Sequence, residues 1–418
     1  MKNSLKLAYT LFVTSSLLFT ACNDEMDAGP GESETYIKLY GSQNNEVPND
    51  MLLNADGSII ILATQEIVLD ETSFKIKVLA LDQLGNLIWE NSYPQNESTE
   101  SVLSYKGGSI IANANGNGYL IIGESINADN QNSVLILEID QTGTQVNSTE
   151  FMIDNGNTPI AGVGLALNSQ GEIKATGLIS SPNNNLWVGT FSSNLELLPE
   201  CSFRYASAVS DPQLLKSTFT NSNDEVVFGL TGFQTTSSRQ NGKLVKVPSC
   251  QPIPLSSPFI VNESNSISYA TSFITKTSSG FAMVGTRNPD DGGDIFISLV
   301  NSDGVPFTNE PIVFNELPGG LVLVGDEEGF SIEQTNDGGY LIGGSSESNS
   351  DGGSDIILIK TNPQGVVQWH QFYGDQNDEE ANILMQSPDG GYLILGNTEF
   401  GGINTLILIK TDRDGNVI

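Results

Sequence analysis

A repeated segment is the feature that most restricts how this chain can fold. Its clearest copies begin at Asp337 and Asp389 and read DGGYLIGG and DGGYLILG, and each is followed by a polar loop and an apolar run that ends in Lys-Thr. Equivalent positions recur at intervals of 52 to 60 residues, at Ser58, Gly118, Gly171, Glu225, Gly280, Gly339 and Gly391. Because a regular period indicates one structural unit used many times, the chain is expected to contain seven such units.

Each unit has the pattern of a small antiparallel sheet. Apolar runs of four to eight residues are separated by Gly, Asn, Asp and Ser, which predicts short strands joined by tight turns. In the last unit the first strand is expected near 381–385, and outermost strands are expected at 366–374 and 87–93. A period near fifty residues with four strands per unit is typical of propeller blades. The predicted fold class is all-β, a seven-bladed β-propeller over residues 35–418.

The two ends of this region have complementary patterns. The seventh unit runs to Asn416 without the aromatic outermost strand that the sixth unit has, whereas the segment 36–41 (YIKLYG) matches the end of that strand at 372–374 (FYG). We therefore predict that the N-terminal strand completes the last blade. Such a shared blade closes the ring and removes exposed sheet edges.

The first 21 residues have the pattern of a secretory signal peptide. Lys2 and Lys6 precede an apolar run from Leu7 to Phe19, and small residues follow. The junction LFTAC, which ends at Cys22, resembles the lipobox of bacterial lipoproteins, in which the Cys is acylated and becomes the new N-terminus. Residues 22–34 then read as this acylated cysteine and a flexible polar tether, and the acidic residues directly after Cys22 resemble the surface-export signal of Bacteroidota lipoproteins. No later segment has 18 consecutive apolar residues, so the lipid is the expected membrane attachment.

The repeat itself resembles that of a known group of proteins. The order DGGYLI, polar loop, DIILIKT, Gly, Trp and Tyr-Gly is similar to the repeats of uncharacterised β-propeller surface lipoproteins of Bacteroidota. Units 1, 6 and 7 match well, whereas units 2 to 5 are degenerate and lack the Trp of the outermost strand. The resemblance implies export and surface display, and it supplies no catalytic residues.

Charge excludes one class of partner. Fifty acidic residues against 17 Lys and Arg give a formal net charge of −33, which repels nucleic acids and anionic lipid surfaces. We therefore expect no nucleic-acid partner.

The remaining cysteines, Cys201 and Cys250, each follow the third strand of neighbouring units. An even number of cysteines in an exported protein favours a disulfide, and two buried free thiols are the alternative.

Few residues carry catalytic chemistry. His370 is the only histidine, which excludes metal sites built from several His residues, and its place beside Trp369 on an outermost strand predicts a surface position. Trp89 also occupies the Trp position of the repeat and is expected to pack between blades. The segment 412–416 (DRDGN) is interpreted as a turn rather than a calcium loop. No catalytic residue is assigned.

The candidate binding residues are acidic. When the four strands of a blade are lettered a to d from the axis outward, the loops between strands b and c and the loops between blades emerge on the same rim. In units 5, 6 and 7 these loops are rich in carboxylates. The predicted ligand-binding or cation-binding residues are Asp290, Asp291, Asp294, Asp351, Asp355, Asp375, Asp378 and Glu379. Such groups suit Ca²⁺ or the hydroxyls of a sugar, and solvated turn chemistry is the alternative. Apart from Ca²⁺ no cofactor is expected.

Taken together, these patterns predict an exported, lipid-anchored propeller that acts as a binding scaffold at the cell envelope, for a glycan or for another envelope protein. A polysaccharide-acting enzyme that uses acidic residues is the first alternative, and a structural component of an envelope complex is the second. The expected location is the outer membrane, facing the cell surface or the periplasm.

Processing at Cys22 gives the first testable prediction. Mass spectrometry of the protein from a native membrane should find cleavage directly before Cys22 and a diacylglycerol group on its sulfur. A Cys22→Ser variant should lose the lipid and leave the membrane fraction. An unmodified N-terminus at another residue would contradict the lipoprotein assignment.

Overall fold

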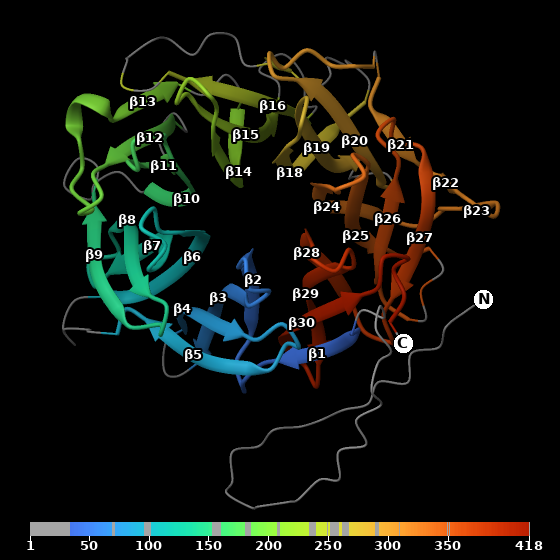
Figure 1. Cartoon of the computed structure of the whole chain (residues 1–418), viewed down its shortest axis with the longest axis horizontal. Helices are drawn as coiled ribbons and strands as arrows, with labels where there is room; N and C mark the ends of the chain where they lie inside the picture. The colour runs from blue at the N-terminus through green and yellow to red at the C-terminus, as the bar shows by residue number, and fades with distance from the viewer. Residues whose placement is uncertain are drawn as a thin grey trace, which may run out of the picture.

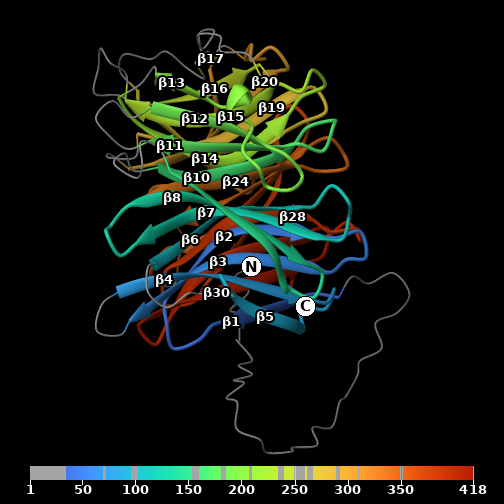
Figure 2. The ribbon, with the colours of Figure 1, turned by 90° about the vertical axis from the view of Figure 1, so that its left-hand side faces the viewer.

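The chain folds into a closed ring of sheets around a central axis (Figure 1). The computed structural model describes residues 34–68, 72–95, 102–152, 160–179, 185–206, 210–233, 240–248, 250, 259–260, 267–288, 292–308, 310–348, 350 and 352–417. Within these residues there are seven four-stranded sheets and one additional two-stranded hairpin. The predicted seven-bladed β-propeller is therefore confirmed. Figure 2 shows the same ring from its side, with successive blades stacked around the axis.

Every blade is an antiparallel sheet in which strand a lies at the axis and strand d at the circumference. Blade 1 contains β2 (Glu46–Leu53), β3 (Ile59–Val68), β4 (Thr72–Leu81) and β5 (Leu87–Tyr93). Blade 2 contains β6 (Val102–Ala112), β7 (Gly118–Asn127), β8 (Asn132–Asp140) and β9 (Gln145–Phe151). Blade 3 contains β10 (Ile160–Leu167), β11 (Ile173–Ile179), β12 (Asn185–Phe191) and β13 (Phe203–Ala206), with the short 3₁₀ helix η2 (Pro199–Cys201) before β13.

The remaining blades follow the same order. Blade 4 contains β14 (Ser210–Thr220), β15 (Val226–Phe233), β16 (Gln240–Val247) and β17 (Phe259–Ile260). Blade 5 contains β18 (Tyr269–Lys276), β19 (Gly280–Arg287), β20 (Asp294–Asn301) and β21 (Ile312–Phe314), and the hairpin of β22 (Glu316–Leu317) and β23 (Leu321–Val322) follows it. Blade 6 contains β24 (Glu327–Gln334), β25 (Tyr340–Ser346), β26 (Asp355–Thr361) and β27 (Val367–Tyr373). Blade 7 contains β28 (Glu379–Gln386), β29 (Tyr392–Phe400) and β30 (Ile403–Thr411), together with β1 (Tyr36–Tyr40).

The strands differ in burial in the way that their sequences predict. The middle strands b and c are covered on both faces by neighbouring blades, and in blade 6 every residue of β25 and β26 is buried. The outermost strand has one face toward solvent, so β9 alternates between half-buried and exposed residues. A continuous apolar run therefore marks a middle strand, and an alternating run marks an edge strand.

The Asp-Gly-Gly and Lys-Thr elements of the repeat form one structural unit. In blade 6 the Asp337 carboxylate accepts hydrogen bonds from the Gly339 N–H at 2.9 Å and from Lys360 Nζ at 2.8 Å, and Gly338 adopts a positive φ of 79° in the turn. In blade 7 Lys410 Nζ lies 2.5 Å from Asp389 in the same way. The lysine of strand c thus neutralises the carboxylate of the turn between strands a and b. The Asp-Gly-Gly and Lys-Thr motif, the most regular one in the sequence, therefore stabilises the turn between strands a and b.

Strand β1 closes the ring, as the sequence predicted. It pairs antiparallel with β30 from Tyr36 opposite Lys410 to Tyr40 opposite Leu406, so the first and last described strands lie side by side (Figure 1). Ile37 and Leu39 pack against the buried cluster shared by blades 6 and 7.

A tyrosine at the end of strand d connects three blades to the next blade. The hydroxyls of Tyr40, Tyr93 and Tyr373 each donate a 2.6 Å hydrogen bond to a glycine carbonyl in the following c–d turn, at Gly85, Gly143 and Gly415 respectively. These are the outer strands of blades 7, 1 and 6, whose sequence repeat is clearest. The Tyr40 bond crosses the closure and joins blade 7 to blade 1.

Strand a of every blade has a register irregularity. The irregularities lie between Pro48 and Asp50, Gly107 and Ser109, Gly162 and Gly164, Leu214 and Thr218, Thr271 and Phe273, Gly329 and Ser331, and Ala381 and Ile383. A bulge bends its strand and changes the direction of the side chain that it carries. At three of these sites the residue before the irregularity donates its backbone N–H to a threonine hydroxyl of the neighbouring blade. The pairs are Gly107 with Thr64, Thr271 with Thr231, and Gly329 with Thr286.

The aromatic residues and the cysteines also join blades. Trp89 Nε1 donates to the Gln141 carbonyl of blade 2 at 3.0 Å, and the Trp369 ring lies 5.8 Å from that of Tyr392 in blade 7. A disulfide joins Cys201, which follows the third strand of blade 3, to Cys250, which follows the third strand of blade 4. No helix in the described part of the chain has the length and apolar character needed to cross a membrane.

Closure gives the second prediction. Deletion of residues 23–41 removes β1 and uncovers the buried strand β30, and the loss of several apolar contacts worth roughly 1–3 kcal/mol each should lower the melting temperature strongly. Deletion of residues 23–33 leaves every described strand in place and is the matched control. Equal melting temperatures for the two truncated proteins in differential scanning calorimetry would show that β1 does not stabilise the ring.

Candidate functional site

The described carboxylates predicted as binding residues lie on one rim of the ring. Asp294 and Asp355 are the first residues of their third strands, and Asp375, Asp378 and Glu379 lie at or just before the start of β28. This is the rim where the b–c and d–a loops emerge. Cys22, Asp290, Asp291 and Asp351 lie outside the described residues.

These carboxylates make hydrogen bonds or ion pairs within the protein. Asp294 forms an ion pair with Arg287 across the end of blade 5, and Asp378 accepts the backbone N–H of Ser354 at 2.9 Å. Asp375 accepts both the N–H and the side-chain amide of Asn377, at 2.9 and 2.7 Å. They therefore stabilise the turns of the rim.

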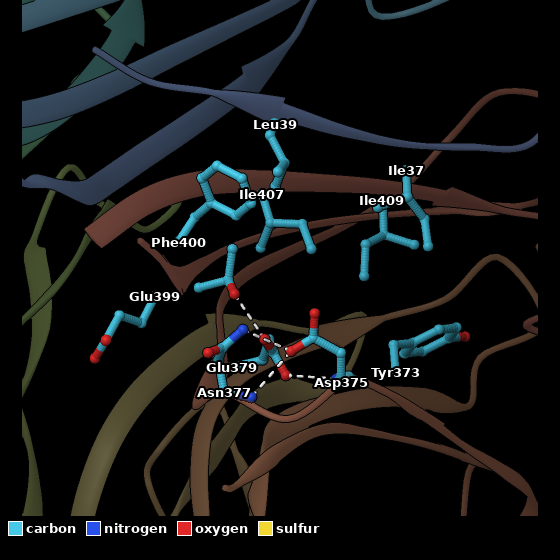
Figure 3. Close-up of a pocket in the computed structure, with 12 residues that line it drawn as sticks. Ile37, Leu39, Tyr373, Asp375, Asn377, Glu379, Glu399, Phe400, Ile407 and Ile409 are labelled. Carbon is cyan, nitrogen blue, oxygen red and sulfur yellow. Dashed lines mark hydrogen bonds between the residues drawn. The ribbon is translucent and has the colours of Figure 1, made fainter. Parts of the chain in front are cut away.

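Asp375 and Glu379 line a small pocket between blades 6 and 7 (Figure 3). Its apolar wall comes from the two outer strands of blade 7, with Ile37 of β1 and Ile407 of β30 among the lining residues. The pocket encloses only about 20 Å³, which is room for about one water molecule. It is too small for a sugar ring.

Glu379 is a buried carboxylic acid at the base of this pocket. It is 3% exposed, and its carboxylate accepts hydrogen bonds from the Thr398 hydroxyl at 2.6 Å and from the Asp375 N–H at 3.1 Å. Burial raises the pKa of the carboxyl from 4.5 to about 7, and repulsion from Asp375 and Asp355 adds to the shift. Folding therefore favours the protonated form of Glu379.

Metal coordination finds no support among the residues that the structure describes, because no group of three or more His, Cys, Asp or Glu side chains is arranged to hold an ion there. His370 is half-buried and packs edge-on against Phe372 with 5.9 Å between ring centres, and burial lowers its pKa. Its ring is part of the outer packing of blade 6.

The larger cavity lies at the axis. It has a volume of about 320 Å³ and is lined by residues of the inner strands of blades 4 to 7 and by residues of β15 and β16 in blade 4. The four inner strands, β14, β18, β24 and β28, surround the centre of the ring in Figure 1. Its apolar residues include Leu215, Phe273, Phe330 and Ile383. Volumes above about 300 Å³ with an apolar lining and a few polar groups are typical of small-molecule sites. We therefore take the axial cavity as the candidate functional site.

Two polar atoms of this cavity have no hydrogen-bond partner among the described residues. One is Thr271 Oγ1, on a side chain that is only 2% exposed, and the other is Asn382 Oδ1. The amide of Asn382 interacts with the Glu380 carboxylate, which leaves the oxygen for another partner. A buried polar atom without a partner costs roughly 1–3 kcal/mol, so a bound water or a ligand group that reaches either atom would stabilise the site.

The bulges explain why these groups reach the cavity. Asn382 occupies the irregularity of β28, Phe330 that of β24, and Ser272, which also lines the cavity, that of β18. Sequence analysis missed this site because a bulge leaves no reliable mark in the sequence. The available signal was an amide in the otherwise apolar segment Ala381–Leu384 of a predicted inner strand.

Comparisons with known proteins identify the architecture. No family model matches the sequence, and no curated protein matches it. An ulvan lyase of polysaccharide lyase family PL25, solved with a bound saccharide of GlcA and Rha3S, aligns with a TM-score of 0.58 and 8% identity over 91% of this chain and 97% of that chain. YCF48 from Cyanidioschyzon merolae aligns with a TM-score of 0.50 and 10% identity over 89% and 98%. A protein of unknown function from Dyadobacter fermentans has a TM-score of 0.49 and 9% identity over 91% and 99%.

At these identities the similarity concerns the fold alone. The chain is a β-propeller whose structural neighbours include a glycan-acting enzyme and proteins of unknown function.

Glu379 gives the third prediction. Because its pKa is higher in the folded protein than its ordinary value of 4.5, it stabilises the fold most at low pH, and this contribution falls as the pH rises from 4.5 through 7. Glu379→Gln keeps an acceptor for Thr398 and removes the titration. The variant should therefore be more stable than the parent at pH 8, by roughly 1–3 kcal/mol, and similar to it at pH 4.5.

Thermal melts at both pH values test this difference. Glu399→Gln removes a carboxylate from an exposed position at the same pocket and serves as the control. A Glu379→Gln effect that is independent of pH would show that folding does not raise the pKa of Glu379.

Proposed function

We propose that this chain is an exported, lipid-anchored propeller of the outer membrane that binds a glycan segment in its axial cavity. The observation that carries the proposal is the pair of unpartnered polar atoms, Thr271 Oγ1 and Asn382 Oδ1, in a cavity of about 320 Å³. Export and lipid attachment are supported by the charged start, the apolar run and the Ala21-Cys22 junction of the sequence.

The lining suits a sugar because it combines the two kinds of surface that a sugar ring presents. Phe273 and Phe330 offer apolar contact for ring C–H groups, and Thr271 and Asn382 contribute a hydroxyl and an amide to the same lining. Gln213 and Gln240 add side-chain amides to the lining. Apolar contact with a few fixed polar groups gives affinity together with orientation.

Binding is favoured over hydrolysis by the same lining. General acid–base catalysis needs a titratable group within hydrogen-bond reach of the reacting atoms. The described residues of the cavity wall contribute amides, hydroxyls and apolar groups, with no Asp, Glu, His, Lys or Cys side chain among them. The ulvan lyase shares the ring architecture at a TM-score of 0.58, which makes a glycan-related role for this fold a reasonable starting point.

The fourth prediction tests the two acceptors. Mature protein should bind at least one neutral oligosaccharide on an array of plant, algal and bacterial glycans. Thr271→Val and Asn382→Leu should each weaken that binding at least tenfold in isothermal titration calorimetry. Thr271→Val replaces an unpartnered hydroxyl by a methyl group, so its melting temperature should stay equal or rise. Asn382→Leu also removes the amide that interacts with Glu380, so its affinity is read against the melting temperature of the same variant.

Thr176→Val is the matched control, since its buried hydroxyl hydrogen-bonds to Thr218 in the contact between blades 3 and 4 and does not line the cavity. It should lower stability and leave affinity unchanged. Failure of all array glycans to bind, or retention of full affinity in both cavity variants, would reject the axial site. Release of new reducing ends during incubation would favour hydrolysis instead.

A further inference from the structure

We infer that the axial cavity selects uncharged saccharides and rejects those that carry carboxylate or sulfate groups. The inference rests on the proposed glycan binding and adds the chemical class of the ligand. It follows from two carboxylates, Glu328 and Glu380, that lie between the cavity and its rim.

The position of these carboxylates follows from the strand direction. Inner strands begin at the rim where the d–a loops emerge and run toward the opposite rim. Glu328 is the second residue of β24 and precedes the cavity residue Phe330, whereas Glu380 is the second residue of β28 and precedes the cavity residue Asn382. A ligand that enters from this rim along blades 6 and 7 therefore passes both carboxylates before it reaches Phe330 and Asn382.

Further carboxylates surround this pair. Burial raises the pKa of Glu380, and repulsion from Glu328 and Asp378 raises it further. Burial likewise raises the pKa of Glu328, with added repulsion from Asp326 and Glu347. These five side chains, from blades 6 and 7 and the segments that precede them, form an acidic group on the rim side of Phe330 and Asn382, which we call the collar. Because carboxylates of blade 6 and blade 7 repel one another, the negative potentials of the individual groups add at this rim.

Arg287, a cationic group on the rim of blade 5, is already paired with a carboxylate. Its partner in this ion pair is Asp294. Glu380 interacts with the side-chain amide of the cavity residue Asn382, which places this carboxylate next to the cavity wall. An anionic group on a saccharide bound beside Asn382 would therefore lie close to a carboxylate. A hydroxyl in the same place could donate to that carboxylate.

The test compares matched neutral and acidic sugars. The probes are cellohexaose, maltohexaose and galactohexaose, each with a counterpart in which the primary hydroxyls are oxidised to carboxylates. At low ionic strength the mature protein should bind a neutral hexasaccharide at least tenfold more tightly than its oxidised counterpart. In 0.5 M NaCl the ratio should shrink, because salt screens exposed charges.

The double variant Glu328→Gln with Glu380→Gln should reduce the ratio to about threefold or less, mainly by admitting the oxidised sugar. Glu196→Gln with Asp414→Asn removes the same charge from exposed c–d turns on the opposite rim and should keep the full ratio. Equal affinity for neutral and oxidised sugars, or a ratio that the collar variant leaves unchanged, would overturn the inference while glycan binding stands. Where none of these probes binds, the comparison uses a glycan that binds on the array together with its oxidised counterpart, and failure of every array glycan would overturn glycan binding and this inference together.

Discussion

The pairing of β1 with β30 is the contact on which the rest of the molecule depends. Each blade buries its faces against two neighbours, so the ring is stable only when the first and last blades also meet. Five residues of β1 supply the missing edge of blade 7, and the Tyr40 hydroxyl then bonds to Gly85 of blade 1. The same tyrosine contact at Tyr93 and Tyr373 repeats inside the ring. Closure therefore uses an interaction that the repeat already contains.

A closed ring also determines where a site can form. The inner strands meet at the axis, and the irregularity in each of them turns a side chain out of the regular strand pattern. In blades 1, 4 and 5 a threonine hydroxyl of strand b accepts a backbone hydrogen bond from the bulge in strand a of the next blade. In blades 6 and 7 the bulges place Phe330 and Asn382 in the cavity wall. The cavity is therefore formed by residues of four blades together.

This difference explains what the sequence could predict. The blade number, the strand order and the shared blade all follow from the sequence repeat. The Asp337–Lys360 ion pair recurs in blade 7, so the residues that form it are repeated in the sequence and mark the unit. The cavity depends on residues from four blades whose approach no local pattern encodes. Asp375 and Asp378 were predicted as binding residues because acidic residues cluster in the sequence, and in the structure they make hydrogen bonds within the turns of the rim. Ligand binding by these carboxylates stays a prediction. Thr271 and Asn382 are isolated polar residues in inner strands and gave no comparable signal.

The shared blade has a consequence for how the chain acquires its structure. Tyr36 is among the first residues of the propeller to be synthesised, and its partner Lys410 is among the last. The contact with the greatest sequence separation is therefore also the one that completes the ring, and contacts between distant segments form slowly because a long loop must close first. Until the C-terminal strand has been synthesised, blade 7 keeps an open strand edge that can pair with other chains. A protein built in this way depends on rapid completion of its C-terminal strand, so conditions that slow its synthesis should promote aggregation before they affect the finished ring.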